Sequence, residues 1–203
     1  MTRKKHERIY MKLIDKAKEK RVNAILYFCK NTNKKQLYQT KIFKLLYFLD
    51  FLHFKEVGRP VTDLEYYAWD YGPVPTKLFF ELRDNTVPEE LQRTYFIEKD
   101  EDTGKQKIKF SCSKSPNLDV FSDREIKILE KVAYFFKDTP SIKISEISHL
   151  KNEPWDRTLK TKGEKQKIDF LLAIDGEAKI DIDTATERLR QSQEMRELFG
   201  REQ

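Results

Sequence analysis

The spacing of apolar side chains predicts that most of the chain is helical. Val22, Ile25, Leu26 and Cys29 recur every three or four positions, which is typical of a helix with one buried face over residues 21–30. Such a helix needs neighbouring elements to cover its apolar side. We therefore expect the first core element close to the N-terminus.

The next helical stretch is apolar around its whole circumference. Its large apolar side chains follow at almost every position: Ile42, Phe43, Leu45, Leu46, Tyr47, Phe48, Leu49, Phe51 and Leu52. A helix of this kind lies in the interior or buries its second face on a partner. Gly58 is expected to end it, and Pro60 prevents its continuation.

Glycine and proline divide the segment that follows. Leu64–Trp69 predicts a short helix, with an extended strand as the alternative. Gly72-Pro73 then forces a turn, and Pro75 suits the first position of another helix. Further on, the β-prone runs 94–97 and 107–110 flank turn residues Asp102-Thr103-Gly104, so a β-hairpin is expected there.

The second half of the chain begins with a strong helix signal. Ser122 and Glu125 fit a capping box, in which each side chain satisfies a backbone N–H of the first turn. Ser145–Leu150 predicts a short helix, and Thr184–Phe199 a polar terminal helix. Residues 156–167 are expected to form a charged loop, and residues 168–182 to contain extended segments. Together these elements predict a mainly α, compact helical domain with a small antiparallel β-hairpin.

Composition restricts the class of protein. The 203 residues suit one domain, and no apolar run reaches the ~18 residues of a membrane span. The basic N-terminus lacks the apolar region of a secretion signal. Cys29 and Cys112 show no spacing typical of a disulfide framework or a metal site, so we expect a reduced, cytoplasmic protein with no membrane association.

The net charge of +6 is confined to the N-terminus. Residues 1–21 hold nine Lys or Arg and three Asp or Glu, and the remainder holds 31 of each sign. The body is therefore not a basic nucleic-acid-binding domain. The basic arm is interpreted as a solvated helix face, with phosphate contact as the alternative.

Candidate chemistry is sparse. No nucleophile elbow, phosphate loop or metal-ligand cluster occurs, so we expect neither an enzyme nor a cofactor. Asp50 and His53, and likewise Glu146 and His149, have the carboxylate-x-x-His spacing of di-iron helices. We favour a structural interpretation without a metal, in which His149 fixes the turn into the segment ending in Trp155.

Aromatic residues near Gly72 form the best candidate for a binding surface. Tyr and Trp are favoured at interfaces because they bury large areas at low entropic cost. Alternate residues are expected to face inward and outward, with Asp70, Tyr71 and Gly72 exposed. The candidate partner-binding residues are Tyr67, Trp69, Asp70, Tyr71, Gly72, Pro73, Val74 and Pro75.

A nucleic-acid role is the alternative. Residues 121–150 can be interpreted as helix, turn and helix, with the hairpin at residues 94–110 as a wing. The start of the second helix is poor in Lys and Arg, where base contacts would be made. A transcriptional regulator that binds its own promoter DNA therefore remains the second hypothesis.

Several short motifs resemble those of a known family. The chain contains K-L-L-Y-F from Lys44, G-R-P from Gly58, and A-x-x-x-G-P-V-P from Ala68. Ile147-Ser148-His149 is followed by Glu153-Pro154-Trp155. In this order the motifs resemble the SocA-type antitoxin domain, also called the Panacea domain, over roughly residues 22–182. The resemblance marks His149, Pro154 and Trp155 as a structural signature.

The resemblance implies a small bacterial or phage protein that neutralises a cognate protein toxin by binding it. It also implies a possible adaptor role, in which a protease or chaperone would be a further partner. We divide the chain into a basic arm (1–21), the antitoxin-like domain (22–182) and a polar C-terminal helix (183–203). The two terminal regions are candidates for setting toxin specificity.

Overall fold

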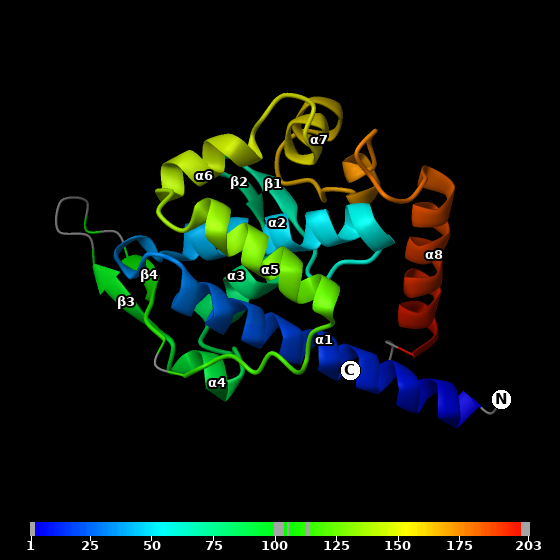
Figure 1. The fold of residues 1–203 in the computed structure, drawn as a ribbon, viewed down its shortest axis with the longest axis horizontal. Coiled ribbons are helices and arrows are strands. Elements are labelled where there is room, and N and C mark those ends of the chain that lie inside the picture. The colour runs from blue at the N-terminus through cyan, green and yellow to red at the C-terminus, as the bar shows by residue number, and fades with distance from the viewer. Residues whose placement is uncertain (1–2, 100–103, 105, 113, 200–203) are drawn as a thin grey trace.

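The computed structural model describes residues 3–99, 104, 106–112 and 114–199. The fold is mainly α with two small antiparallel hairpins, which confirms the predicted class (Figure 1). Helix α2 (Gln39–Val57) lies at the centre and contacts helices on several sides. Among the described residues, no helix is both long enough and apolar enough to cross a membrane.

Helix α2 is buried around its circumference, as its composition predicts. Ile42, Leu45, Leu46 and Leu49 have no exposed surface. The helix ends at Gly58, which has a left-handed backbone (φ 63°) and donates its N–H to the carbonyl of Phe54. Helix α2 thus supplies most of the framework on which the other elements pack.

Helix α1 (Arg3–Asn31) is one continuous helix that carries the basic arm into the core. Its buried face begins near Val22, so the arm extends beyond the packed body (Figure 1). The helix passes through residue 21 without a break, and the division into arm and domain at that point stays a prediction.

A disulfide joins α1 to the segment after the second hairpin. Cys29 and Cys112 are bonded, with Cα atoms 5.7 Å apart. We expected two reduced thiols, and that prediction is wrong for this structure. A separation of 83 residues gives no sequence signal of proximity. The cytoplasmic location stays a prediction.

Two hairpins flank the central helix. Strands β1 (Tyr67–Trp69) and β2 (Gly72–Val74) pair with Ala68 opposite Pro73. The short helix predicted for Leu64–Trp69 is therefore wrong. The backbone of β1 instead bonds to a second chain segment, with the Ala68 N–H donating to the carbonyl of Gln166.

The second hairpin confirms the prediction for residues 94–110. Strands β3 (Tyr95–Lys99) and β4 (Gln106–Phe110) are antiparallel, with Ile97 opposite Ile108. Of the predicted turn residues, Asp102 and Thr103 lie outside the described part of the chain. Gly104 has a positive φ of 67°, which suits a turn.

The capping box predicted at Ser122 and Glu125 is present at the start of α5 (Asp123–Phe136). Helix α6 (Ser141–Ser148) begins earlier than predicted, directly after Pro140. The short helical elements between α1 and α5 are η1 (Lys34–Gln36), α3 (Thr76–Arg83) and α4 (Glu89–Gln92).

The segment predicted as a charged loop is helical. Helix α7 (Pro154–Lys162) starts with proline at its first turn, and Trp155, Thr158 and Leu159 turn the same face to the core. The charged residues cover the opposite face, so their abundance concealed the helical period.

The extended backbone predicted for residues 168–182 is present only in short pieces: Ile168 donates its N–H to the carbonyl of Tyr66, and Asp169 and Ile174 are extended. The 3₁₀ helix η2 (Phe170–Ala173) lies between them, capped by Asp169, and Phe170 stacks on Phe51 of α2. The terminal helix α8 (Ile182–Phe199) then forms as predicted. It lies beside the rest of the fold and approaches the N-terminal half of α1 (Figure 1).

Candidate partner-binding surface

The β1–β2 hairpin presents its turn to solvent and buries its second strand. Tyr71 is 78% exposed, and Asp70 beside it is also exposed. Tyr67 and Trp69 are half-buried. Gly72, which we expected at the surface, is buried with the other residues of the proline-rich motif: Gly72, Pro73, Val74 and Pro75.

A lysine of the central helix anchors this strand from below. Lys44 is 1% exposed, and its Nζ donates to the carbonyl oxygen of Pro73 at 2.9 Å. Burial lowers the pKa of Lys44 to about 7, because the charged form loses hydration. The position of Lys44 within a helix that is apolar on all sides was a sequence signal for a buried polar contact, which we did not predict.

Gly72 leaves room for three polar side chains. A Cβ atom at this position would lie 2.6 Å from His149 Nε2 and 2.8 Å from both Lys44 Cε and Ser148 Oγ. The residue also has a φ of 96°, a backbone angle that residues other than glycine rarely adopt. Both the local backbone and the packing therefore require glycine in this motif.

His149 closes the cluster from the end of α6. Its ring stacks on Trp155, with ring centroids 3.9 Å apart and planes 15° apart. Trp155 Nε1 donates to the carbonyl oxygen of Trp69 at 3.0 Å. Burial and the nearby Lys44 lower the pKa of His149, and its Nε2 has no hydrogen-bond partner among the described residues.

Three motifs that are far apart in sequence thus converge on one point. The helix lysine, the glycine-proline strand and the His–Trp pair meet beneath the exposed turn at Tyr71. We call this set the signature cluster: Lys44, Gly72, Pro73, Ser148, His149 and Trp155. The cluster positions the hairpin, because Lys44 bonds to strand β2 and Trp155 to strand β1.

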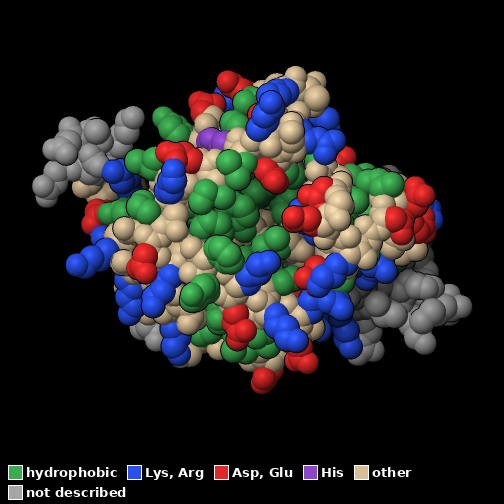
Figure 2. Space-filling view, turned by 45° about the horizontal axis from the view of Figure 1, so that its top comes forward, with side chains coloured by type: hydrophobic (Ala, Val, Ile, Leu, Met, Phe, Trp, Pro, Cys, Tyr) green, Lys and Arg blue, Asp and Glu red, His purple; other side chains and the backbone are tan. Residues whose placement is uncertain are grey.

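Exposed apolar side chains stand next to the signature cluster in sequence, Tyr71 beside Gly72 and Leu150 beside His149, and others lie on α5 and α6. The large side chains of the end of α5, of α6 and of the hairpin turn remain accessible, with exposed fractions between 57% and 82%. Figure 2 shows hydrophobic side chains gathered on one face of the molecule. We call the following residues the α5–α6 face: Tyr71, Tyr134, Phe135, Ile142 and Leu150.

The first candidate metal pair has other roles in the structure. Asp50 is fully buried and accepts hydrogen bonds from the N–H groups of Val61 and Thr62, from Thr62 Oγ1 and from Tyr66 Oη. His53 Nδ1 bonds to the carbonyl oxygen of Arg59 at 2.7 Å. These contacts fix the loop that leads from α2 to β1. In the part of the chain that is described, no three potential ligands gather as a metal site.

Burial raises the pKa of Asp50 to about 6, and its four hydrogen bonds oppose that shift.

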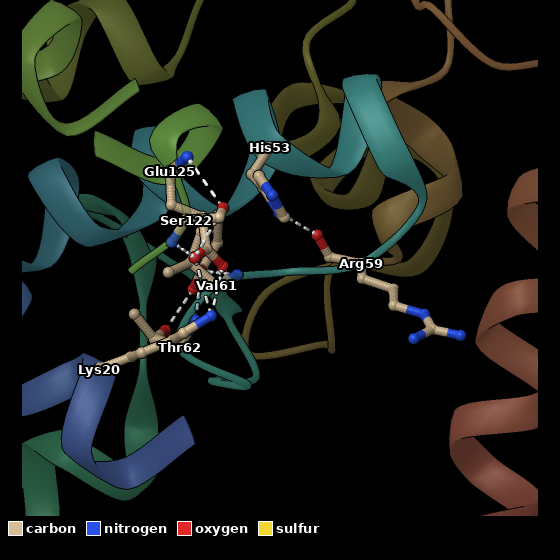
Figure 3. A network of polar contacts seen from close by, with 8 residues as sticks. Lys20, His53, Arg59, Val61, Thr62, Ser122 and Glu125 are labelled. Carbon is tan, nitrogen blue, oxygen red and sulfur yellow. Dashed lines mark hydrogen bonds and ion pairs between the residues drawn. The ribbon is translucent and has the colours of Figure 1, made fainter. Parts of the chain in front are cut away.

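Lys20 of α1 donates to both oxygens of Glu125, at 2.6 and 2.8 Å (Figure 3). Glu125 also completes the capping box of α5. This ion pair therefore ties the end of the basic arm to α5, a contact that the sequence did not reveal.

A comparison with protein families gives one match. The model described as antitoxin SocA-like, Panacea domain, matches residues 42–156. No curated protein and no solved structure matches the chain significantly. The matched segment contains the whole signature cluster and the α5–α6 face, whereas α1 and α8 lie outside it.

Proposed function

Because the chain belongs to the SocA-like antitoxin family with a Panacea domain, we propose that it neutralises a cognate protein toxin by binding it directly. The membership supports an antitoxin role in general, and the surface of this chain supports a specific mode. In that mode the protein acts without chemical catalysis and blocks the toxin by occupying its surface.

The α5–α6 face is the observation that carries this proposal. Five large apolar side chains lie exposed there, and protein interfaces are enriched in such residues at their centres. Contiguous apolar patches on a soluble protein are typical of interaction sites. The signature cluster holds the hairpin turn in a fixed place, so little conformational entropy would be lost when a partner buries Tyr71.

The first turn of α6 favours a protein partner over promoter DNA. Ile142 is 77% exposed there, and the neighbouring Lys143 is paired with Glu146 at 2.7 Å. A recognition helix presents its N-terminal residues to base edges and phosphates. An apolar side chain and a lysine already paired with a glutamate are poorly suited to such contacts.

The proposal is tested by isolating partners of the tagged chain from its native host and identifying them by mass spectrometry. A co-purified protein should arrest growth when expressed alone and permit growth when expressed with this chain. Ile142→Asp should weaken that binding by about tenfold or more, since it places a charge in the centre of the interface. Ile97→Asp is the matched control, because Ile97 is exposed (56%) on strand β3 and is not one of the five residues of this face.

Two other outcomes are informative. A fall in the amount of toxin on co-expression, reversed when proteases are inactivated, would indicate that the chain also acts as an adaptor for degradation. Recovery of promoter DNA without any protein partner would contradict direct neutralisation and favour the regulator.

A further inference from the structure

The first half of helix α8 packs closely on the end of α2. The Cδ1 atom of Ile180 and the Cδ atom of Arg188 lie within 3.1 Å of a Cβ placed on Gly58, so the chain packs tightly there. Arg188 also donates to the carbonyl oxygen of Val57 at 2.7 Å. Beyond this attachment the helix faces the N-terminal half of α1 (Figure 1), and residues of both helices line a groove.

The groove consists of two adjoining hollows of about 770 and 730 Å³ that share Ala17 and the segment 59–61 as a wall. The first hollow has a mixed lining of apolar and charged side chains, and the second has a mainly cationic lining. The apolar side chains come from α1, the α2–β1 loop, the segment before η2 and α8: Ile14, Leu64, Ile168, Leu189 and Met195. The cations of the second hollow are Lys16, Lys20, Arg59, Arg124 and Arg188.

Six acidic side chains of the described residues line these hollows, and all of them are engaged within the protein. Asp169 accepts a hydrogen bond from the N–H of Leu171, and Asp63 is not free either. Glu125 is paired with Lys20, and Glu56 with Lys179 and Arg124. Glu65 is paired with Lys167, and Glu194 with Arg190. The excess of positive charge is therefore confined to the second hollow, where five cations and two carboxylates of the described residues line the wall.

Two of the cations are available to a partner. Lys16 and Arg59 are exposed, and neither side chain has a hydrogen bond or ion pair with another described residue. The side chain of Arg59 points away from the polar network at its base and toward α8 (Figure 3). It thus stands where the two hollows meet.

We propose that this groove binds an acidic amphipathic segment of the partner protein. Its apolar side chains would fill the hollow beside α8, and its carboxylates would pair with Lys16 and Arg59. The complementarity of charge identifies the occupant, since an anionic segment gains attraction and a basic one is repelled. This inference deepens the proposed function, because α1 and α8 lie outside the family match and would give this chain its own partner preference.

The test uses the full chain and a defined probe, so it does not depend on finding the toxin. The probe is a fluorescein-labelled helical peptide with leucine on one face and glutamate on the other, measured by anisotropy. Matched peptides replace every glutamate by glutamine or by lysine. The acidic peptide should bind at least tenfold more tightly than either, and its binding should weaken as salt is raised to about 0.5 M.

Charge reversal locates the site. Arg59→Glu and Lys16→Glu should each weaken binding of the acidic peptide by about tenfold. Lys18→Glu makes the same change in net charge on an exposed residue of the same helix that lines neither hollow, and it should change binding less than twofold. Equal losses for all three variants would show that the peptide senses only net charge and would overturn the proposal.

The outcome is separable from that of the proposed function. If the peptide does not bind in the groove while a toxin is still neutralised through the α5–α6 face, the groove inference alone fails. If the peptide binds as expected and no toxin is found, the proposed antitoxin function fails while the groove stands.

Discussion

Lys44 and His149 both border the space where Gly72 has no side chain, so three separate parts of the chain meet around one missing Cβ atom. The amine holds strand β2 through Pro73, and the imidazole stacks on Trp155. The exposed turn at Tyr71 is therefore positioned by buried contacts beneath it, not by its own short hairpin, which is too small to be stable alone.

Gly72→Ala should destabilise the protein by about 2–4 kcal/mol, because it combines a positive φ with a collision at 2.6 Å. Gly163→Ala is the control. Gly163 has a similar φ of 91° but has nothing within 4 Å of the added Cβ, so only the backbone cost on the order of 1–3 kcal/mol applies. Urea unfolding of both variants measures the difference, and equal losses would show that crowding around Gly72 does not matter.

Lys44 should make stability depend on pH above neutrality. Its pKa is about 7 in the folded protein and about 10.4 when exposed. Between these values the unfolded chain binds a proton that the folded chain lacks, so the unfolding free energy rises with pH from about 7 to about 10. The slope from this group is up to about 1.4 kcal/mol per pH unit.

Lys44→Met should remove that slope, while Lys18→Met, at an exposed position, should retain it. Urea unfolding at about pH 7, 8 and 9 provides the measurement for the three proteins. A wild-type slope that persists in Lys44→Met would assign the pH dependence to another group.

Asp50→Ala should cost about 3–5 kcal/mol, because it leaves several buried donors without an acceptor. Thr62→Val removes one hydroxyl donor and should cost about 1 kcal/mol. Thermal or urea unfolding checks both values. The combined variant should lose less than the two losses added together, since Thr62 Oγ1 has no partner left once Asp50 is gone.

Gly58→Ala should loosen α8 without disturbing the hairpins. The residue has φ 63°, and its added Cβ would press on Ile180 at 3.0 Å. We expect faster amide hydrogen exchange in α8 and unchanged exchange in β1–β2. Gly176→Ala, where nothing lies within 4 Å, is the control and should leave both regions as they are. Unchanged exchange in α8 would mean that its attachment does not depend on Gly58.

Local signals predicted the elements whose pattern is complete within one segment. The apolar helix that Gly58 ends, the capping box at Ser122 and the hairpin at residues 94–110 each carry their own period and stop residues. These features depend on neighbours in sequence, so a single chain is sufficient to predict them.

The remaining features depend on contacts between distant segments. Strand β1 exists because its backbone pairs with Gly72–Val74 and bonds to residues 165 and 166. The pairing of Cys29 with Cys112 and the meeting of Lys44 with His149 are likewise tertiary contacts. The sequence indicated that Tyr71 is exposed, but it could not indicate that Gly72 beside it is buried.

The wide spacing of the signature cluster has a consequence for synthesis on the ribosome. Lys44 and Trp155 are more than a hundred residues apart, so the cluster cannot close until the later residues have emerged. At ordinary elongation rates that interval lasts about 5–20 seconds. During this interval, the central helix and the turn at Tyr71 lack their contacts with His149 and Trp155. A nascent or truncated chain that ends before Trp155 would therefore expose an incomplete core to chaperones and proteases.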